Sequence, residues 1–246
     1  MTPFLFATKR KVPRPPTDCR LIVELAGASR GDNHGAHLSG SSWSRIVPFL
    51  PISVCSNCRP VAERTGEVGC WIIASQPIGQ LAKAETFWHH DVYATRAETE
   101  AARASGSAVV ESLGKTWLLT IADQGWRPSG GERIAEIGPL PIIAGQTYSA
   151  PYMEAIFTPR IVAPSHTHAG PEAWYTQAGE TCLETPQGKQ IGRAGGPPVI
   201  VTGGPPMHLT ATGTEQRRAL VLILHDSSKH ATTPEHDWVP KGLCKI

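Results

Sequence analysis

The feature that most constrains the fold is a series of short apolar runs, each ended by a glycine or proline turn signal, from about Phe87 onward. The runs are 108–111, 116–121, 152–157, 173–176, 198–201 and 219–224. The turn signals include Gly130-Gly131, Gly138-Pro139, Gly195-Gly196-Pro197 and Gly203-Gly204-Pro205-Pro206. The chain has 24 glycines and 22 prolines in 246 residues, more than the usual shares of about 7% and about 5%. Short strands with this punctuation predict an all-β sandwich or barrel.

Charge and hydropathy argue against two broad classes of protein. The chain has 23 Lys and Arg against 21 Asp and Glu, for a net charge of +2, and no basic cluster. We therefore expect no nucleic-acid partner. No apolar run of about 18 residues occurs, so no membrane-spanning helix is predicted. The six cysteines are too few for a scaffold built on disulfides.

The first 86 residues differ from the rest of the chain. Residues 1–70 show no sustained period of two or 3.6 residues, which predicts a flexible, poorly structured N-terminal extension. Residues 71–86 have three interpretations: a linker, an ordinary buried strand at 71–74, or a signal-like segment. The last rests on an apolar stretch that follows two arginines and precedes Ala82-Lys83-Ala84, a small-x-small cleavage pattern. Both a cytoplasmic and an exported or periplasmic location therefore stay open.

Residues 87–246 are predicted to form one folded domain. Near its start, Thr95-Arg96-Ala97-Glu98 is a capping box that opens a short helix, and Gly106 can end it. Strand-like runs fill the remainder, so the helix precedes the predicted barrel.

A short histidine-rich segment carries the chemistry. His166 and His168 are two residues apart, so on a strand both imidazoles project from the same face. The turn around Gly170 can bring Glu172 back toward the same pocket. Two neutral imidazoles and a carboxylate suit a divalent first-row metal, and His208 is the best-placed fourth ligand.

This spacing resembles the first motif of the cupin superfamily, in which a glycine, an HxH pair, a glutamate and a second glycine follow at set intervals. His166, His168, Glu172 and Gly179 match the motif in register, and Arg160 stands in place of its leading glycine.

The second cupin motif is matched only loosely. His208 fits its histidine, but Gly203 and Pro205 stand in place of its proline and second glycine, and Thr212 replaces its asparagine. The resemblance implies a cupin-type double-stranded β-helix, a jelly-roll-like barrel with its motif core at about 150–225. It also implies one divalent metal ion held by His166, His168, Glu172 and His208. The sequence does not distinguish Fe, Mn, Zn and Ni.

Two classes of function fit such a metal site. A metal with four protein ligands in an octahedral sphere keeps about two positions open, which suits an oxygenase, an isomerase or a lyase acting on a small polar molecule. The alternative is a non-catalytic cupin module that binds or senses a small ligand. The enzyme hypothesis predicts a second ionisable group beside the metal, with Glu154 and Tyr152 the nearest candidates in sequence. The binding hypothesis predicts a pocket with only apolar and aromatic lining.

Strand alternation predicts the rest of the pocket lining. If Glu172 points inward, Trp174 does too and is a candidate to contact substrate, whereas Tyr175 points away. On the run at 152–157, the inward side chains are either those of Met153, Ala155 and Phe157 or those of Tyr152, Glu154 and Ile156.

Cys182 and Cys244 are the only cysteines after residue 87. In an exported protein, a disulfide between them would tie the C-terminal tail to the strand after Gly179. In a cytoplasmic protein we expect two free thiols instead. The sequence leaves open whether the chain forms a homodimer.

Overall fold

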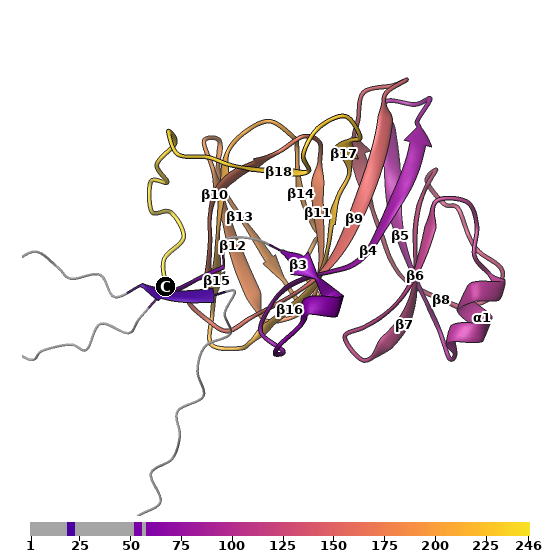
Figure 1. The fold of residues 1–246 in the computed structure, drawn as a ribbon, viewed down its shortest axis with the longest axis horizontal. Coiled ribbons are helices and arrows are strands. Elements are labelled where there is room, and N and C mark those ends of the chain that lie inside the picture. Colours follow the sequence, from indigo (N-terminus) through magenta and orange to yellow (C-terminus); the bar gives the residue numbers. More distant parts are fainter. Residues whose placement is uncertain (1–18, 23–51, 56–57) are drawn as a thin grey trace, which may run out of the picture.

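The computed structural model describes residues 58–246 in full, together with the backbone of two short strands, β1 (Cys19–Ile22) and β2 (Ile52–Cys55). The described chain is mainly β-structure, and its strands form three sheets, which we call A, B and C (Figure 1). The all-β prediction is confirmed.

Sheet A contains β1, β2 and five later strands. These are β10 (Val162–His168), β12 (Glu180–Thr185), β13 (Gly188–Arg193), β15 (Met207–Thr212) and β18 (Thr232–Pro234). The strand order is β1-β2-β10-β15-β12-β13, with β18 paired to β10.

Sheet B is the middle sheet. Its strands are β3 (Arg59–Pro60), β4 (Gly69–Gln80), β9 (Thr147–Phe157), β11 (Glu172–Ala178), β14 (Val199–Val201), β16 (Arg217–Ile223) and β17 (His225–Asp226). The order is β14-β11-β16-β9-β4-β3, with β17 paired to β9, and a single 3-10 turn, η1 (Val61–Glu63), follows β3.

Sheet C is formed by one continuous part of the chain. Its strands are β5 (Glu85–Tyr93), β6 (Ser107–Ser112), β7 (Lys115–Ala122) and β8 (Glu132–Pro141), in the order β6-β7-β5-β8. The predicted short helix is α1 (Arg96–Ala101), and both capping-box bonds form between Thr95 and Glu98, at 3.0 and 3.2 Å. In the described residues, no helix has the length and apolarity to cross a membrane.

Sheets A and B face each other as the two sheets of a jelly roll, and an apolar core fills the space between them. It includes Met153, Phe157, Trp174, Leu183, Met207 and Val221. These side chains alternate along their strands with residues that point the other way, so each strand contributes one face to this core.

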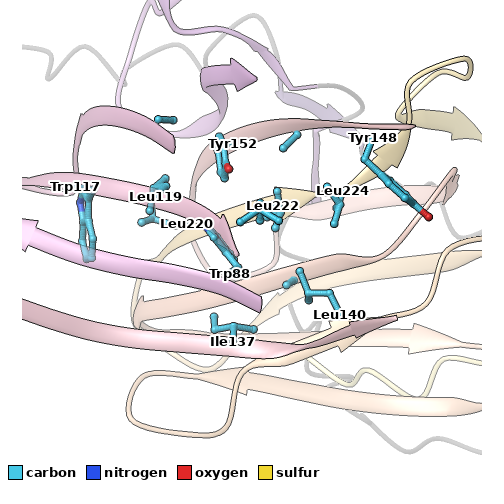
Figure 2. Close-up of a cluster of buried hydrophobic side chains, with 14 of the residues drawn as sticks. Trp88, Trp117, Leu119, Ile137, Leu140, Tyr148, Tyr152, Leu220, Leu222 and Leu224 are labelled. Carbon is cyan, nitrogen blue, oxygen red and sulfur yellow. The ribbon is translucent and has the colours of Figure 1, made fainter. Parts of the chain in front are cut away.

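A second core lies between sheets B and C (Figure 2). It contains Trp88, Trp117 and Leu119 from sheet C, and Tyr152, Leu220 and Leu222 from sheet B. Sheet B is therefore buried on both faces, which explains why 219–224 is apolar without a break. The strands at 85–141 are an added layer outside the jelly roll.

The folded part begins earlier than the sequence analysis placed it. Residues 69–80 form β4, which pairs with β9 from Gly69↔Ile156 to Gln80↔Thr147, and Trp71 is fully buried. Residues 71–74, for which an ordinary buried strand was one interpretation, lie within β4. Register shifts on either side of residues 74–77 accommodate Pro77 within the strand.

Parts of the predicted N-terminal extension are also ordered. β1, β2 and β3 come from residues 1–70, and strands of two to four residues are too short to show a period in the sequence. The prediction for 1–18, 23–51 and 56–57 lies outside the described residues.

Two disulfides connect the described chain. Cys182 on β12 is bonded to Cys244 in the C-terminal tail, with their Cα atoms 5.5 Å apart. Of the two alternatives that the sequence left open, the structure shows the disulfide. Cys58 is bonded to Cys70 at the start of β4, with a Cα separation of 4.5 Å. The sequence analysis did not foresee this second bond.

Candidate metal and ligand site

A cavity of about 530 Å³ lies between sheets A and B. Most of its wall is apolar, formed by side chains that include Ile72, Met153, Phe157, Leu209, Val221 and Ile223. His166, His168 and Glu172 open onto it together. The three residues that the HxH…E pattern predicted therefore lie at one place in the fold.

Local backbone geometry brings these three side chains together. His166 and His168 project from the same face of β10, with ring centroids 4.8 Å apart. The turn between β10 and β11 is tight, because a Cβ atom at Gly170 would lie 2.0 Å from the carbonyl oxygen of Leu224. Glycine at this position lets the turn lie directly against the backbone of Leu224. The carboxylate of Glu172 then lies 3.6 Å from the imidazole of His168, measured from Oε2 to Nε2.

Backbone carbonyls fix which nitrogen of each imidazole points into the cavity. Nδ1 of His166 lies 2.7 Å from the carbonyl oxygen of Pro164, and Nδ1 of His168 lies 2.9 Å from that of Ala231. A carbonyl oxygen only accepts hydrogen bonds, so each Nδ1 carries the proton and donates it. In the neutral ring the lone pair is then on Nε2, the arrangement usual for metal-binding histidines.

The charges of the three groups are strongly coupled. Burial lowers the pKa of His166, and the neighbouring His168 lowers it further. Burial also disfavours the charged form of His168, but the carboxylate of Glu172 outweighs it and raises the pKa of His168. Burial raises the pKa of Glu172, and the two histidines outweigh this and lower it. The carboxylate is therefore ionised at neutral pH, as metal binding requires.

The donor atoms fit a divalent metal. Within residues 58–246, no group of three or more His, Cys, Asp or Glu side chains is arranged closely enough to hold an ion. However, Nε2 of His168 and Oε2 of Glu172 are buried and have no hydrogen-bond partner. Two donors bound about 2.1 Å from one ion lie roughly 3.0 to 3.4 Å apart at octahedral or tetrahedral angles. The 3.6 Å between these atoms is close to that spacing.

His208 does not join this site. Its neighbours Met207 and Leu209 belong to the core between sheets A and B, so the His208 side chain projects from the opposite face of β15. It pairs across the sheet with Glu184, whose carboxylate accepts hydrogen bonds from the backbone N–H groups of Lys241 and Leu243 in the C-terminal tail. Met207 takes the inward position opposite His166, so the structure does not bring His208, the predicted fourth ligand, to the other three residues.

Glu154 and Tyr152 are also remote from the site. Met153, Ala155 and Phe157 line the cavity, which leaves Tyr152 in the core between sheets B and C. Glu154 pairs with Arg64 and accepts a hydrogen bond from Ser112 Oγ at 2.5 Å. Both belong to the other face of sheet B, so neither can act on a molecule in the cavity.

A more open hollow of about 630 Å³ surrounds Glu154, Arg64 and Ser112. Of its charged groups, Glu154 and Arg64 are paired with each other, and Glu111 and Lys115 are exposed to solvent. The hollow therefore gathers no set of unpaired polar groups comparable to that of the cavity between sheets A and B.

The alternation predicted from Glu172 is correct. Trp174 lines the cavity, whereas Tyr175 packs against the core between sheets B and C. Contact between Trp174 and a substrate stays a prediction.

Four further ionisable side chains line the cavity that were not selected from the sequence: Arg217, His225, Lys229 and His230. Arg217 could have been found, because counting back in twos from the inward Ile223 through Val221 reaches it. Arginines occupy both 217 and 218, so one of them points inward whichever face of the strand is buried. The sequence alone therefore does not show that an inward arginine is significant here.

Comparison with known proteins gives structural similarities only. No family model matches the chain, and no curated protein matches it. Among solved structures, a cupin-like protein from Thermotoga maritima is 13% identical, with a TM-score of 0.32, over 35% of this chain and 64% of that one. A cupin-2 domain protein from Shewanella frigidimarina is 14% identical, with a TM-score of 0.26, over 30% and 68%.

An oxalate oxidase is 16% identical, with a TM-score of 0.30, over 35% of this chain and 45% of that one. This chain thus spans less than two thirds of the first of these proteins and less than half of the oxalate oxidase. The solved structures that this chain is similar to include proteins described as cupins, the superfamily that its HxH…E segment resembles.

Proposed function

We propose that this chain is a metal-dependent enzyme of the cupin type, which holds one divalent ion through His166, His168 and Glu172 and acts on a small polar molecule. The observation that carries the proposal is the pair of buried atoms, Nε2 of His168 and Oε2 of Glu172, which face each other across 3.6 Å as an ion-pair contact. In the described chain neither atom forms a hydrogen bond. Buried polar atoms normally have partners, and a metal ion would supply one for both.

The proposed ligand set is two imidazoles and one carboxylate. Such a set leaves several coordination positions open and is typical of sites where substrate binds directly to the metal. When bound, the ion supplies Lewis-acid polarisation of a substrate oxygen or, if it is iron, redox chemistry. The hydrogen bonds from His166 and His168 to backbone carbonyls hold these two imidazoles in the orientation that points Nε2 into the cavity.

The cavity lining favours an enzyme over a passive binding module. A binding module was expected to show only apolar and aromatic lining, and this cavity also contains Arg217, His225 and Lys229. Nδ1 of His225 lies 2.9 Å from the backbone carbonyl of Asp226 and therefore carries a proton. Its other nitrogen is then available to accept a proton from a bound molecule, the role of a general base.

Elemental analysis of the purified protein tests the metal proposal. We expect about one divalent metal ion per chain in the wild type and less than a tenth of that in His168→Ala and Glu172→Ala, because each loses a donor and admits water. His208→Ala is the matched control, since it removes a histidine from the opposite face of sheet A. Full metal content in the first two variants would contradict the assignment.

A further inference from the structure

Arg217 is a buried arginine at the start of β16. It is opposite Phe157 in the register between β16 and β9, and its side chain lies on the same face as those of Val221 and Ile223. Only 1% of the residue is exposed to solvent, yet it lines the cavity that contains His166, His168 and Glu172. Its guanidinium lies over the rings of Trp174 and Phe157, with Cζ 4.9 and 5.5 Å from their centroids.

The charge of Arg217 is unpaired. Its Nε and Nη2 atoms have no hydrogen-bond partner, and no carboxylate in the described chain forms an ion pair with it. Burial lowers the pKa of Arg217 to about 10, with the carboxylate of Glu172 acting in the opposite direction. The side chain is therefore still charged at neutral pH. A buried charge without a partner is costly, which calls for a counter-charge at this position.

Arg133, a partly buried arginine, shows how this fold pairs an arginine with a structural role. Its Nε and Nη2 donate to the two carboxylate oxygens of Asp91, at 2.8 and 3.1 Å, and Nη2 also donates to the carbonyl of Trp126. The same two nitrogens of Arg217 donate to nothing. The protein completes the Arg133 site from its own residues and leaves the Arg217 site incomplete.

The chemistry of the unused atoms identifies the missing partner. Nε and Nη2 lie on one edge of a guanidinium, and their N–H bonds run parallel, so together they match the two oxygens of a carboxylate. The guanidinium lies over the rings of Trp174 and Phe157, and the hydrogen bonds it can still form run from its edges. Among the ionisable side chains that line the cavity, Glu172 is the acid, against Arg217, Lys229 and several histidines.

We propose that Arg217 anchors the carboxylate of a small organic acid, whose other end reaches His166, His168 and Glu172. The second half of this statement rests on the proposed metal site, and the first half does not. The substrate class of the proposed enzyme is then an organic acid with a second oxygen function, rather than a neutral sugar or alcohol.

Calorimetric titration with acetate, malonate, succinate and glutarate tests this inference, with succinamide as the neutral control. We expect at least one of these acids to bind the wild type and succinamide not to bind. Arg217→Lys keeps the charge but loses the paired donors, so we expect at least tenfold weaker binding. Arg217→Met is expected to abolish binding. Arg218→Met is the matched control, because Arg218 is adjacent on β16 but pairs with Glu67 outside the cavity.

Thermal unfolding provides a second readout. Arg217→Met removes an unpaired buried charge, so we expect its melting temperature without ligand to equal or exceed that of the wild type. If Arg217 had a purely structural role, Arg217→Met would instead lower the melting temperature. The inference is overturned if no acid binds the wild type and Arg217→Met lowers the melting temperature, or if inorganic phosphate binds through Arg217 and no carboxylate does.

Acetate binding after chelator treatment separates this inference from the metal proposal. We expect acetate to bind the metal-free protein through Arg217, and Arg217→Met to keep the wild-type metal content. If the wild type holds no metal but acetate binding still depends on Arg217, then the metal proposal fails and the carboxylate anchor stands. Loss of metal in Arg217→Met would contradict the separation of the two sites.

Discussion

His90 is an unusual residue in the core between sheets B and C. It is fully buried among Trp88, Trp117 and Tyr175, and neither ring nitrogen has a hydrogen-bond partner. Burial, and to a lesser extent the charge of neighbouring His89, lowers the pKa of His90 to about 3. The folded protein therefore keeps this imidazole neutral down to about pH 3.

This predicts a specific dependence of stability on pH. Between about pH 6.5 and about pH 3 the unfolded chain binds a proton at His90 and the folded chain does not, so acid lowers the free energy of unfolding through this residue. This loss of stability is absent above about pH 6.5 and grows by about 1.4 kcal/mol for each pH unit down to about pH 3. Replacing His90 by leucine removes it.

Urea unfolding of the wild type and His90→Leu at pH 7.5 and pH 5 measures the effect. At pH 7.5 we expect the variant to be at least as stable, because it loses two polar atoms that lack partners. At pH 5 we expect its advantage to increase by roughly 2 kcal/mol. A constant difference between the two pH values would show that His90 does not resist protonation in the fold.

Single residues also show what the sequence can and cannot predict. His166, His168 and Glu172 were found because spacing along one strand and across a tight turn fixes their common face. His208 could not be placed from the sequence, because its orientation depends on which residue of β15 faces inward, and the loose second motif does not determine this. Arg217 was missed because its environment is formed by Phe157 and Trp174, which are distant in sequence.

At the scale of the elements, β9 and β16 belong to a sheet with two buried faces. Apolar residues occupy both faces, so the pattern of β9 could not show whether Met153 or Tyr152 faces the cavity. The same ambiguity left Glu154 as a catalytic candidate. Its actual partners lie on the other face of sheet B: Arg64, which follows η1, and Ser112 and Leu113, where β6 turns into β7. Strand existence was predictable here, and strand orientation was not.

The C-terminal tail is held to β12 by two kinds of contact. Cys182 is bonded to Cys244, and Glu184 accepts two backbone N–H groups of the tail. The disulfide closes a loop of 62 residues, which limits the conformations of the unfolded chain.

We expect the double variant Cys182→Ala, Cys244→Ala to lose about 4 kcal/mol of unfolding free energy, the chain-entropy value for a loop of this length. The double variant Cys58→Ala, Cys70→Ala opens a loop of 12 residues, and we expect a smaller loss of about 3 kcal/mol. Denaturant unfolding under non-reducing conditions gives both values. If the Cys182/Cys244 variant loses less unfolding free energy than the Cys58/Cys70 variant, the contacts that hold the tail, rather than loop length, determine the difference between the two losses.

At the scale of the whole molecule, sheet B separates two cores with different roles. The space between sheets A and B contains the cavity and its polar groups, whereas the space between sheets B and C contains none of the proposed ligands. Sheet C was not anticipated as a separate layer, because its strands have the same short, punctuated pattern as those of the jelly roll. Stability and metal binding should therefore respond to different substitutions.

Leu222→Ala tests this separation. Leu222 is fully buried on the sheet C side of β16, so its truncation is expected to cost about 2 to 5 kcal/mol of unfolding free energy. We expect the folded variant to keep the metal content of the wild type. A folded Leu222→Ala protein without metal would show that the two cores are coupled through sheet B.

The most direct measurement of the central claim is an anomalous-scattering map from crystals of the metal-loaded protein. The account predicts one strong peak in the cavity between sheets A and B, within bonding distance of His166 Nε2, His168 Nε2 and a carboxylate oxygen of Glu172. A peak beside His208 on the outer face of sheet A, or a cavity without any peak in protein that contains metal, would contradict it.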